Sequence, residues 1–176
     1  MAVTMEQIKE LRERTGAGIL EAKKVLESTN GDMKQALELM RERGLQVAAK
    51  KATREVREGR VDVYLHHGNK LGALVEINCE TDFVARNDAF IQLTKDIALQ
   101  IASSPETKYI TKDEVPAGEA EAYEEGADEF YKQAVLVEQA FVRNASETIG
   151  QMIQNTIAKT GENIVVRRFA RFGIGA

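Results

Sequence analysis

The sequence predicts an α+β fold, in which an N-terminal three-helix bundle precedes a small antiparallel sheet with helices packed on one side. Two changes of pattern lead to this prediction. Apolar residues over the first 45 positions recur every three or four residues, the period of a helix. From position 61 the period becomes two, as in a strand, and helical periods return after position 87. We therefore expect a helical domain at 1–45, a helical linker at 46–60 and an α+β core at 61–176.

Three short helices are predicted within the first domain. Thr4 and Gln7 form a capping-box pattern at the start of the first helix, and the following Thr-Gly-Ala-Gly run ends it. The second helix ends in a Ser-Thr-Asn-Gly run, after which Asp32 caps the third. Gly44 is expected to end the third helix, because it follows two arginines that suit a helix C-terminus. A bundle of this size has a small core, so it is more often a binding unit than a catalytic one.

The linker that follows is basic. Five of the sixteen residues at 45–60 are Lys or Arg. We interpret this segment as a solvated helix that connects the two domains. The alternative interpretation is a strip of positive charge that follows a phosphate backbone.

A β-hairpin is predicted next. Apolar residues alternate with others in two runs, which are Val61, Val63 and Leu65, and then Val75, Ile77 and Cys79. Gly68-Asn69 supplies the turn chemistry between the runs. Asn87 then caps a helix, whose inward face is expected to carry Phe90, Leu93, Ile97 and Ile101. The segment 81–86 is therefore the connection between a strand and a helix.

Two more helices and a strand complete the predicted core. A long helix is expected after Pro116, with an apolar stripe at Tyr123, Ala127, Phe130, Ala134 and Val137. Asn144 is interpreted as the N-cap of the next helix, which Gly161 ends. The apolar stripe of that helix is Ile149, Met152, Ile153, Thr156 and Ile157. The last strand is expected over 163–172.

The sequence contains no convincing catalytic or metal-binding constellation. Cys79 with His66 or His67 would supply a nucleophile and a base, but Cys79 falls on the apolar face of its strand and is interpreted as a core residue. Both histidines flank a turn and are expected to be exposed. Glu80 and Asp82 lack the spacing of a calcium loop, and no glycine run has the residues of a phosphate-binding loop. We therefore expect no catalytic residue, no metal site and no cofactor, and predict that the protein is not an enzyme.

The charge distribution favours a protein partner. The net charge is −4, but residues 1–60 carry 13 Lys and Arg against 10 Asp and Glu, whereas 104–130 carry 2 against 9. A nucleic-acid-binding domain usually has a larger basic excess, and charge polarity of this kind orients a protein partner. The segment VVRRFARFG at 165–173 has three arginines and two phenylalanines, as in a base-stacking platform. Its arginines and aromatic residues are mixed on both faces, so direct nucleic-acid binding is not expected.

The compartment is expected to be the cytoplasm. No apolar run reaches 18 residues, and the first 15 residues carry charges throughout, unlike a secretory signal. A single cysteine cannot form an internal disulfide, which fits a reducing environment. No association with a membrane is expected.

Phe83 lies in the charged connection NCETDFVARND at 78–88. One interpretation is that its ring folds back to cap the sheet. The other is that the ring projects from a loop held between a strand and a helix, where binding residues often lie. A projecting ring beside the Asp82 carboxylate would then enter an apolar pocket on a partner.

Three separated parts of the chain carry a resemblance to a known family. The first is the motif Thr81-Asp82-Phe83-Val84, and the second is LRERTGAGILEAKKVLESTNGDMKQALELMRERG at 11–44. The third is the C-terminal part, with LVEQAFVRNASETIGQMI at 136–153 and ENIVVRRFARF at 162–172. They stand in the order found in the bacterial translation elongation factor Ts family. The resemblance covers nearly the whole chain except the acidic stretch near 104–128.

The resemblance implies a guanine nucleotide exchange factor that binds elongation factor Tu in its GDP-bound and nucleotide-free states and promotes GDP release and GTP reloading. It implies that the N-terminal bundle is ubiquitin-associated-like and docks on the nucleotide-binding domain of the partner, with contributions from 11–24. Thr81, Asp82, Phe83 and Val84 would form the loop that inserts into that domain and dislocates its magnesium ion.

The resemblance also implies a short form of the family. Longer members carry a duplicated core, whereas only one hairpin-plus-helix unit is found here. A homodimer would supply the second core, and the edge of a small sheet favours such pairing. The alternative function is an RNA- or ribosome-associated binding protein, which would use the basic linker and the arginine-rich last strand.

Overall fold

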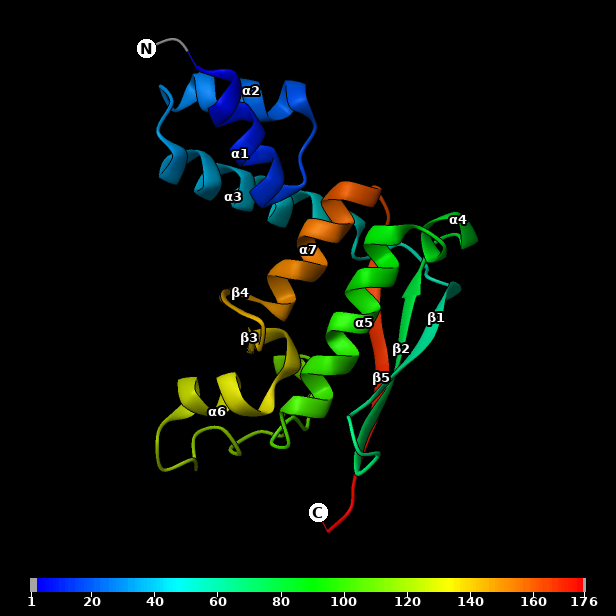
Figure 1. Ribbon diagram of the computed structural model, residues 1–176. Helices are drawn as coiled ribbons and strands as arrows, with labels where there is room; N and C mark the ends of the chain where they lie inside the picture. The colour runs from blue at the N-terminus through cyan, green and yellow to red at the C-terminus, as the bar shows by residue number, and fades with distance from the viewer. Residues whose placement is uncertain (1–2, 176) are drawn as a thin grey trace.

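The computed structural model describes residues 3–175, and its N-terminal part is a three-helix bundle (Figure 1). The helices are α1 (Met5–Thr15), α2 (Ile19–Ser28) and α3 (Met33–Lys51). Thr4 and Gln7 form the expected capping box, and the side chain of Asp32 caps α3 by accepting a hydrogen bond from Gln35 N. Six buried residues form the core of the bundle: Ile8, Leu11, Ala22, Val25, Leu26 and Ala36. The predicted bundle is therefore confirmed.

The prediction that Gly44 ends the third helix is wrong. Helix α3 continues through Gly44 for seven further residues and ends at Lys51. Gly44 is buried where α3 crosses the C-terminal helix, and Val47 and Ala48 pack against the core of the second part of the chain. Tertiary packing thus overrides the weak helix propensity of glycine. The segment 46–60, expected as a helical linker, is helical only as far as Lys51; a turn follows, and a strand begins at Glu58.

The second part of the chain contains a three-stranded antiparallel sheet. Its strands are β1 (Glu58–Leu65), β2 (Leu71–Cys79) and β5 (Ile164–Gly173), in the order β1-β2-β5. Helices α5 (Asp88–Ser103) and α7 (Ile149–Thr160) lie on the same side of the sheet (Figure 1). Val75, Ile77 and Cys79 on β2 face these helices and are fully buried. The predicted fold class, an antiparallel sheet with helices packed on one side, is confirmed.

The other face of the sheet is apolar and exposed. Val61, Val63 and Leu65 of β1 alternate as predicted, but they are 63%, 62% and 59% exposed. The inward face of β1 instead carries Asp62, which accepts a hydrogen bond from Thr94 Oγ1 of α5 at 2.8 Å. The register of the three strands places Leu74 of β2 opposite Val63, and Phe172 of β5 two strands from Leu65, so both residues also lie on the outward face.

The segment between α5 and α7 differs most from its prediction. Instead of a long helix after Pro116, it contains turns, the 3-10 helix η1 (Lys112–Glu114) and the short helix α6 (Ala127–Ala134). Gly126 has a φ of +92°, which α-helical backbone does not allow, so the helix begins only at Ala127. The expected stripe residues Phe130 and Ala134 are buried in a small satellite cluster, but Val137 lies in the 3-10 helix η2 (Leu136–Glu138).

The expected cap at Asn144 is also wrong. Asn144 begins β4 (Asn144–Thr148), which pairs with β3 (Ala140–Phe141). The N-cap of α7 is Thr148, which forms a capping box with Gln151. Gly161 ends α7 with a φ of +78°, as predicted, and the last strand is found in its expected place.

Candidate functional site

Phe83 projects from the surface at one end of the sheet. It lies in the single-turn helix α4 (Asp82–Ala85), between β2 and α5 (Figure 1). Its side chain is 83% exposed, whereas Val84 is 9% and Ala85 6% exposed. The interpretation in which the Phe83 ring folds back to cap the sheet is therefore wrong. A large apolar side chain is usually buried in a folded protein, so the exposure of the Phe83 ring points to a binding role.

Local sequence explains why α4 forms at this point. Thr81 has extended backbone, and its side chain caps the turn by accepting a hydrogen bond from Val84 N at 3.5 Å. Val84 and Ala85 belong to the main hydrophobic core, so they hold the turn against β1 and β2. The same turn thus presents one side to the core and one residue, Phe83, to the solvent.

Asp82 lies beside Phe83 but has a partner within its own turn. Arg86 Nη2 lies 3.0 Å from Asp82 Oδ2, and the two side chains are 80% and 47% exposed. An ion pair this exposed contributes little to stability, so Asp82 is able to exchange Arg86 for another cation or donor.

A carboxylate from a distant part of the chain holds the base of this loop. Glu162 Oε2 accepts hydrogen bonds from Glu80 N at 3.1 Å and Thr81 N at 3.0 Å. Glu162 Oε1 accepts the hydroxyl of Thr81 at 2.6 Å. Glu162 is not predicted from the sequence, since it is 81 residues from Thr81 and no local pattern signals the contact.

Cys79 is a core residue, as predicted, and lies directly beneath the loop. It is fully buried, and its Sγ donates to the carbonyl oxygen of Thr81 at 3.2 Å. Burial raises the pKa of the Cys79 thiol from its ordinary value of 9.0 to about 11, and the nearby Glu162 carboxylate adds to the rise. The thiol is therefore protonated at neutral pH and is a poor nucleophile.

The histidines do not complete a catalytic group with Cys79. His66 and His67 lie exposed at the tip of the β1–β2 hairpin, and His66 Nδ1 is 3.0 Å from Tyr64 Oη. Within residues 3–175, no cluster of three or more His, Cys, Asp and Glu side chains has an arrangement that could hold a metal ion.

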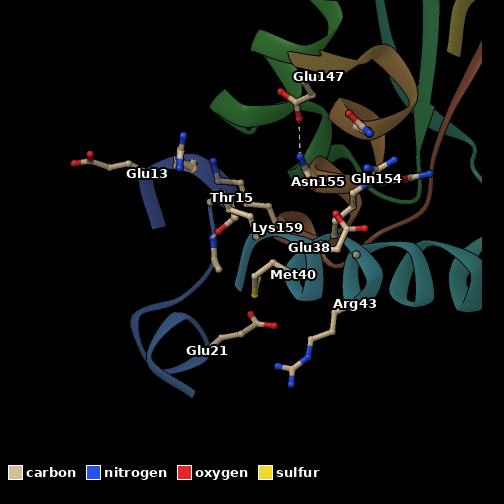
Figure 2. Close-up of a pocket in the computed structure, with 18 of the residues that line it drawn as sticks. Glu13, Thr15, Glu21, Glu38, Met40, Arg43, Glu147, Gln154, Asn155 and Lys159 are labelled. Atoms are coloured by element: carbon tan, nitrogen blue, oxygen red, sulfur yellow. Dashed lines mark hydrogen bonds between the residues drawn. The ribbon is translucent and has the colours of Figure 1, made fainter. Parts of the chain in front are cut away.

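A large polar cleft opens between the bundle and α7, beside the place where α3 packs against α7 (Figure 2). Its volume is about 950 Å³, and side chains from α1, α2 and α3 face those of β4 and α7 across it. Both acidic and basic residues line it, among them Glu38, Arg43 and Lys159. Glu147 accepts a hydrogen bond from Asn155 Nδ2 at 2.6 Å on the α7 side (Figure 2). The charges of the walls largely balance, so the cleft does not favour a ligand of either sign.

The bundle exposes two apolar residues at the start of α2. Ile19 is 52% and Leu20 is 76% exposed, and both follow the Gly16–Gly18 turn that joins α1 to α2. They lie inside the stretch 11–24, which the sequence analysis associates with docking. None of the helices described over residues 3–175 is long and apolar enough to cross a membrane.

Comparison with known proteins agrees with these features. The family model described as Elongation factor TS matches residues 3–126. Elongation factor Ts of Herpetosiphon aurantiacus is 46% identical over an alignment of 198 positions, gaps included, that covers 100% of both chains. The same protein of Heliobacterium modesticaldum is 47% identical, and that of Acetivibrio thermocellus is 48% identical, each covering 98% of this chain and 90% of the relative. A family match over most of the chain, together with relatives of this identity over its full length, shows that the chain belongs to the elongation factor Ts family.

Proposed function

We propose that this protein releases GDP from elongation factor Tu by inserting the loop Thr81–Val84 beside the nucleotide and dislocating the magnesium ion held there. The general role, a nucleotide exchange factor for elongation factor Tu in protein biosynthesis, comes with membership of the family. No covalent bond is made or broken in this step, so the protein acts as a binding factor and not as an enzyme. A translation factor of this kind works in the cytoplasm.

The exposure of Phe83 is the observation that carries the proposal. A phenylalanine that is 83% exposed lies on a turn whose other side is anchored in the core. The backbone of Phe83 is therefore held at a fixed place, so only the rotamer freedom of the ring itself is lost when it enters an apolar pocket. Asp82 beside it supplies a charge that competes for a cation or a donor next to that pocket.

The free energy gained by burying the Phe83 ring is large enough to change nucleotide affinity measurably. Burying a phenylalanine side chain is worth about 2–3 kcal/mol, which corresponds to roughly 30- to 150-fold in affinity. This energy weakens nucleotide binding only if the pocket opens in the nucleotide-free state of the partner. The coupling is reciprocal, so GDP weakens the binding of this protein by the same factor.

The bundle supplies a second contact in this proposal. Ile19 and Leu20 form an exposed apolar pair beside a glycine turn, and the bundle is proposed to dock them on the nucleotide-binding domain of the partner. Arg12 of α1 lies beside this turn, because its Nε donates to the carbonyl oxygen of Ala17 at 3.3 Å. The α+β core is proposed to contact a second domain.

We also propose that the protein is a homodimer. The outward face of the sheet, with Val61, Val63, Leu65, Leu74 and Phe172 at its surface, is a better candidate than the edge expected from the sequence. Apolar side chains from all three strands form one surface there, and single sheets are stable when a second layer covers such a surface. A second copy of this chain would supply that layer.

The alternative function, RNA binding through the last strand, has less support. Arg168 Nε donates to Glu76 Oε2 at 2.7 Å, and Arg171 Nε donates to the carbonyl oxygen of Ala102 at 3.2 Å. Phe169 packs against the core, so it is not presented for stacking. Arg171 and Phe169 are thus engaged within the protein, whereas Arg168, whose side chain is 80% exposed, has a surface ion pair.

The proposal is tested by the release of a fluorescent GDP from elongation factor Tu. We expect the native protein to accelerate release and Phe83→Ala to lose most of that acceleration. Ile174→Ala removes another apolar side chain, 78% exposed and outside the loop, and serves as the matched control. Equal acceleration by native protein and Phe83→Ala would refute the role of the loop. A steep loss of partner binding with added salt would favour phosphate contacts instead.

A further inference from the structure

The turn 161–163 joins α7 to β5, and it also contacts segments of the chain outside these two elements. The Glu162 carboxylate accepts three hydrogen bonds, two from backbone N–H groups of Glu80 and Thr81 and one from the Thr81 hydroxyl. Hydrogen bonds to an ionised carboxylate are about twice as strong as neutral ones. All three donors belong to the residues that immediately precede α4.

The Thr81 hydroxyl links this carboxylate to the exposed turn. Its hydrogen is donated to Glu162 Oε1 at 2.6 Å, which leaves the oxygen lone pairs available to Val84 N at 3.5 Å. Glu162 therefore fixes the rotamer in which Thr81 caps α4. The direction of α4 sets the direction of the Phe83 ring, because Phe83 has no burial of its own to hold it.

The same turn is joined to the end of the bundle helix. Lys51 Nζ donates to the carbonyl oxygen of Gly161. Asn163 Nδ2 donates to the carbonyl oxygen of Arg54 at 2.9 Å, and Asn163 N donates to Glu80 Oε1 at 2.7 Å. The end of α3, the segment after it and the Phe83 loop thus meet at three consecutive residues.

We propose that Glu162 is a positioning residue for nucleotide exchange, which holds Phe83 in its inserting direction at a fixed place relative to the bundle. This inference rests on the proposed function of the loop. Glu162 acts through Glu80 and Thr81, the residues that precede α4, and not by contact with the partner's nucleotide site. Its side chain is half-buried and outside the hydrophobic core, and the pairing of Ile164 with Cys79 holds β5 without it.

The test compares Glu162→Gln with the native protein in GDP release from elongation factor Tu, measured over a range of exchange-factor concentrations. Gln keeps the shape of the side chain but loses the charge and one acceptor oxygen. We expect the maximum release rate to fall by about 10-fold or more, up to the roughly 30- to 150-fold that Phe83 itself supplies, because Glu162 acts through that ring. The concentration that gives half the maximum rate should stay near its native value, because the bundle still docks.

Glu147→Gln is the matched control. Glu147 is another half-buried glutamate of the same part of the chain, and it accepts a hydrogen bond from Asn155 Nδ2 but does not touch the loop. This variant should release GDP at the native maximum rate. A loss equal to that of Glu162→Gln would show a general effect of altered packing and would overturn the inference.

A double variant separates positioning from a role in stability. If Glu162 acts through Phe83, then Phe83→Ala combined with Glu162→Gln should be no slower than Phe83→Ala alone. Multiplied losses in the double variant would overturn the inference. A native rate in Glu162→Gln would overturn it while leaving the proposed function intact, whereas a native rate in Phe83→Ala would overturn both.

Thr81 variants keep the test decisive if Glu162→Gln fails to fold. Thr81→Val removes the hydroxyl with little change of shape, and Thr81→Ser restores it. We expect Thr81→Val to lower the maximum release rate and Thr81→Ser to recover most of it. Equal rates for the two variants would contradict a role for the Glu162–Thr81 hydrogen bond.

Discussion

Phe83 and Val84 are consecutive residues of one helical turn, yet the side chain of Phe83 is 83% exposed and that of Val84 is 9% exposed. This contrast predicts opposite consequences for two alanine substitutions. Val84→Ala removes two buried methyl groups and should lower the free energy of unfolding by about 2 kcal/mol. Phe83→Ala should leave it within about 0.5 kcal/mol of native. Urea unfolding followed by circular dichroism measures both; a large loss of stability in Phe83→Ala would contradict the exposed position.

Gly44 provides a prediction of increased stability. It lies inside α3, and a Cβ added there would meet only Asn155 Oδ1, at 4.0 Å. Because glycine is a poor helix former, Gly44→Ala should raise the free energy of unfolding by about 0.5–1 kcal/mol.

The opposite result is expected for Gly59→Ala. Gly59 has a φ of +147°, and its Cβ would lie 2.2 Å from the carbonyl oxygen of Ile77. Thermal unfolding of the two variants should therefore shift in opposite directions, and a destabilised Gly44→Ala would show that α3 and α7 pack more closely than described.

Cys79 predicts a stability difference that depends on pH. The pKa of the thiol is about 11 in the folded protein against an ordinary 9.0, so the folded state retains the proton that the unfolded state loses between these values. The stability contributed by the protonated thiol is complete below pH 9.0 and falls as pH rises towards about 11.

Comparison with Cys79→Ala isolates this effect from other groups that titrate at high pH. The native protein should be the more stable at pH 8, and its advantage should shrink by up to about 1.4 kcal/mol per pH unit above pH 9. The measurement is urea unfolding of both proteins from pH 8 to 10.5. A constant difference over this range would show that the thiol has the same pKa in both states.

The outward face of the sheet gives a prediction for assembly. Light scattering should report twice the chain mass of 19.5 kDa for the native protein at micromolar concentration. Leu74→Asp places a charge at the centre of this face and should give the mass of one chain. Leu45→Asp changes a residue of similar exposure on α3 and should leave the dimer intact. A native mass of 19.5 kDa would contradict the proposed dimer.

Much of the fold could be predicted because its signals are local. The capping box of Thr4, the alternation around Val75 and the glycine at position 161 each act within a few residues, and each was found as expected. The prediction that the third helix ends at Gly44 is wrong, because the low helix propensity of glycine does not reveal that α7 packs against this residue. The prediction of a long helix after Pro116 is wrong for a related reason. The apolar residues of its stripe pack in a satellite cluster built mostly from turns, and the spacing of these residues does not reveal this.

The site could be predicted only in part. The sequence indicates Phe83 as an unusual residue, but it is compatible with both a capping ring and a projecting ring, and only the exposure of the side chain distinguishes them. Glu162 could not be found from one sequence, because its three hydrogen bonds join residues more than 80 positions apart. The partner-binding roles of Thr81, Asp82, Phe83 and Val84 and the division into domains stay predictions.

Helix α3 belongs to both parts of the molecule. It has 19 residues, about 28 Å of helix, and it packs Ala36 in the bundle and Val47 against the main core. A continuous helix does not bend freely, so the apolar pair Ile19–Leu20 and the ring of Phe83 are held at a constant separation. In the proposed function, where both places contact the partner, the molecule acts as a bivalent ligand with a stiff spacer: once one contact forms, the other is present at a high effective concentration. Flexible residues inserted into α3 would leave both contacts intact and still weaken binding, because the gain from linking them would be lost.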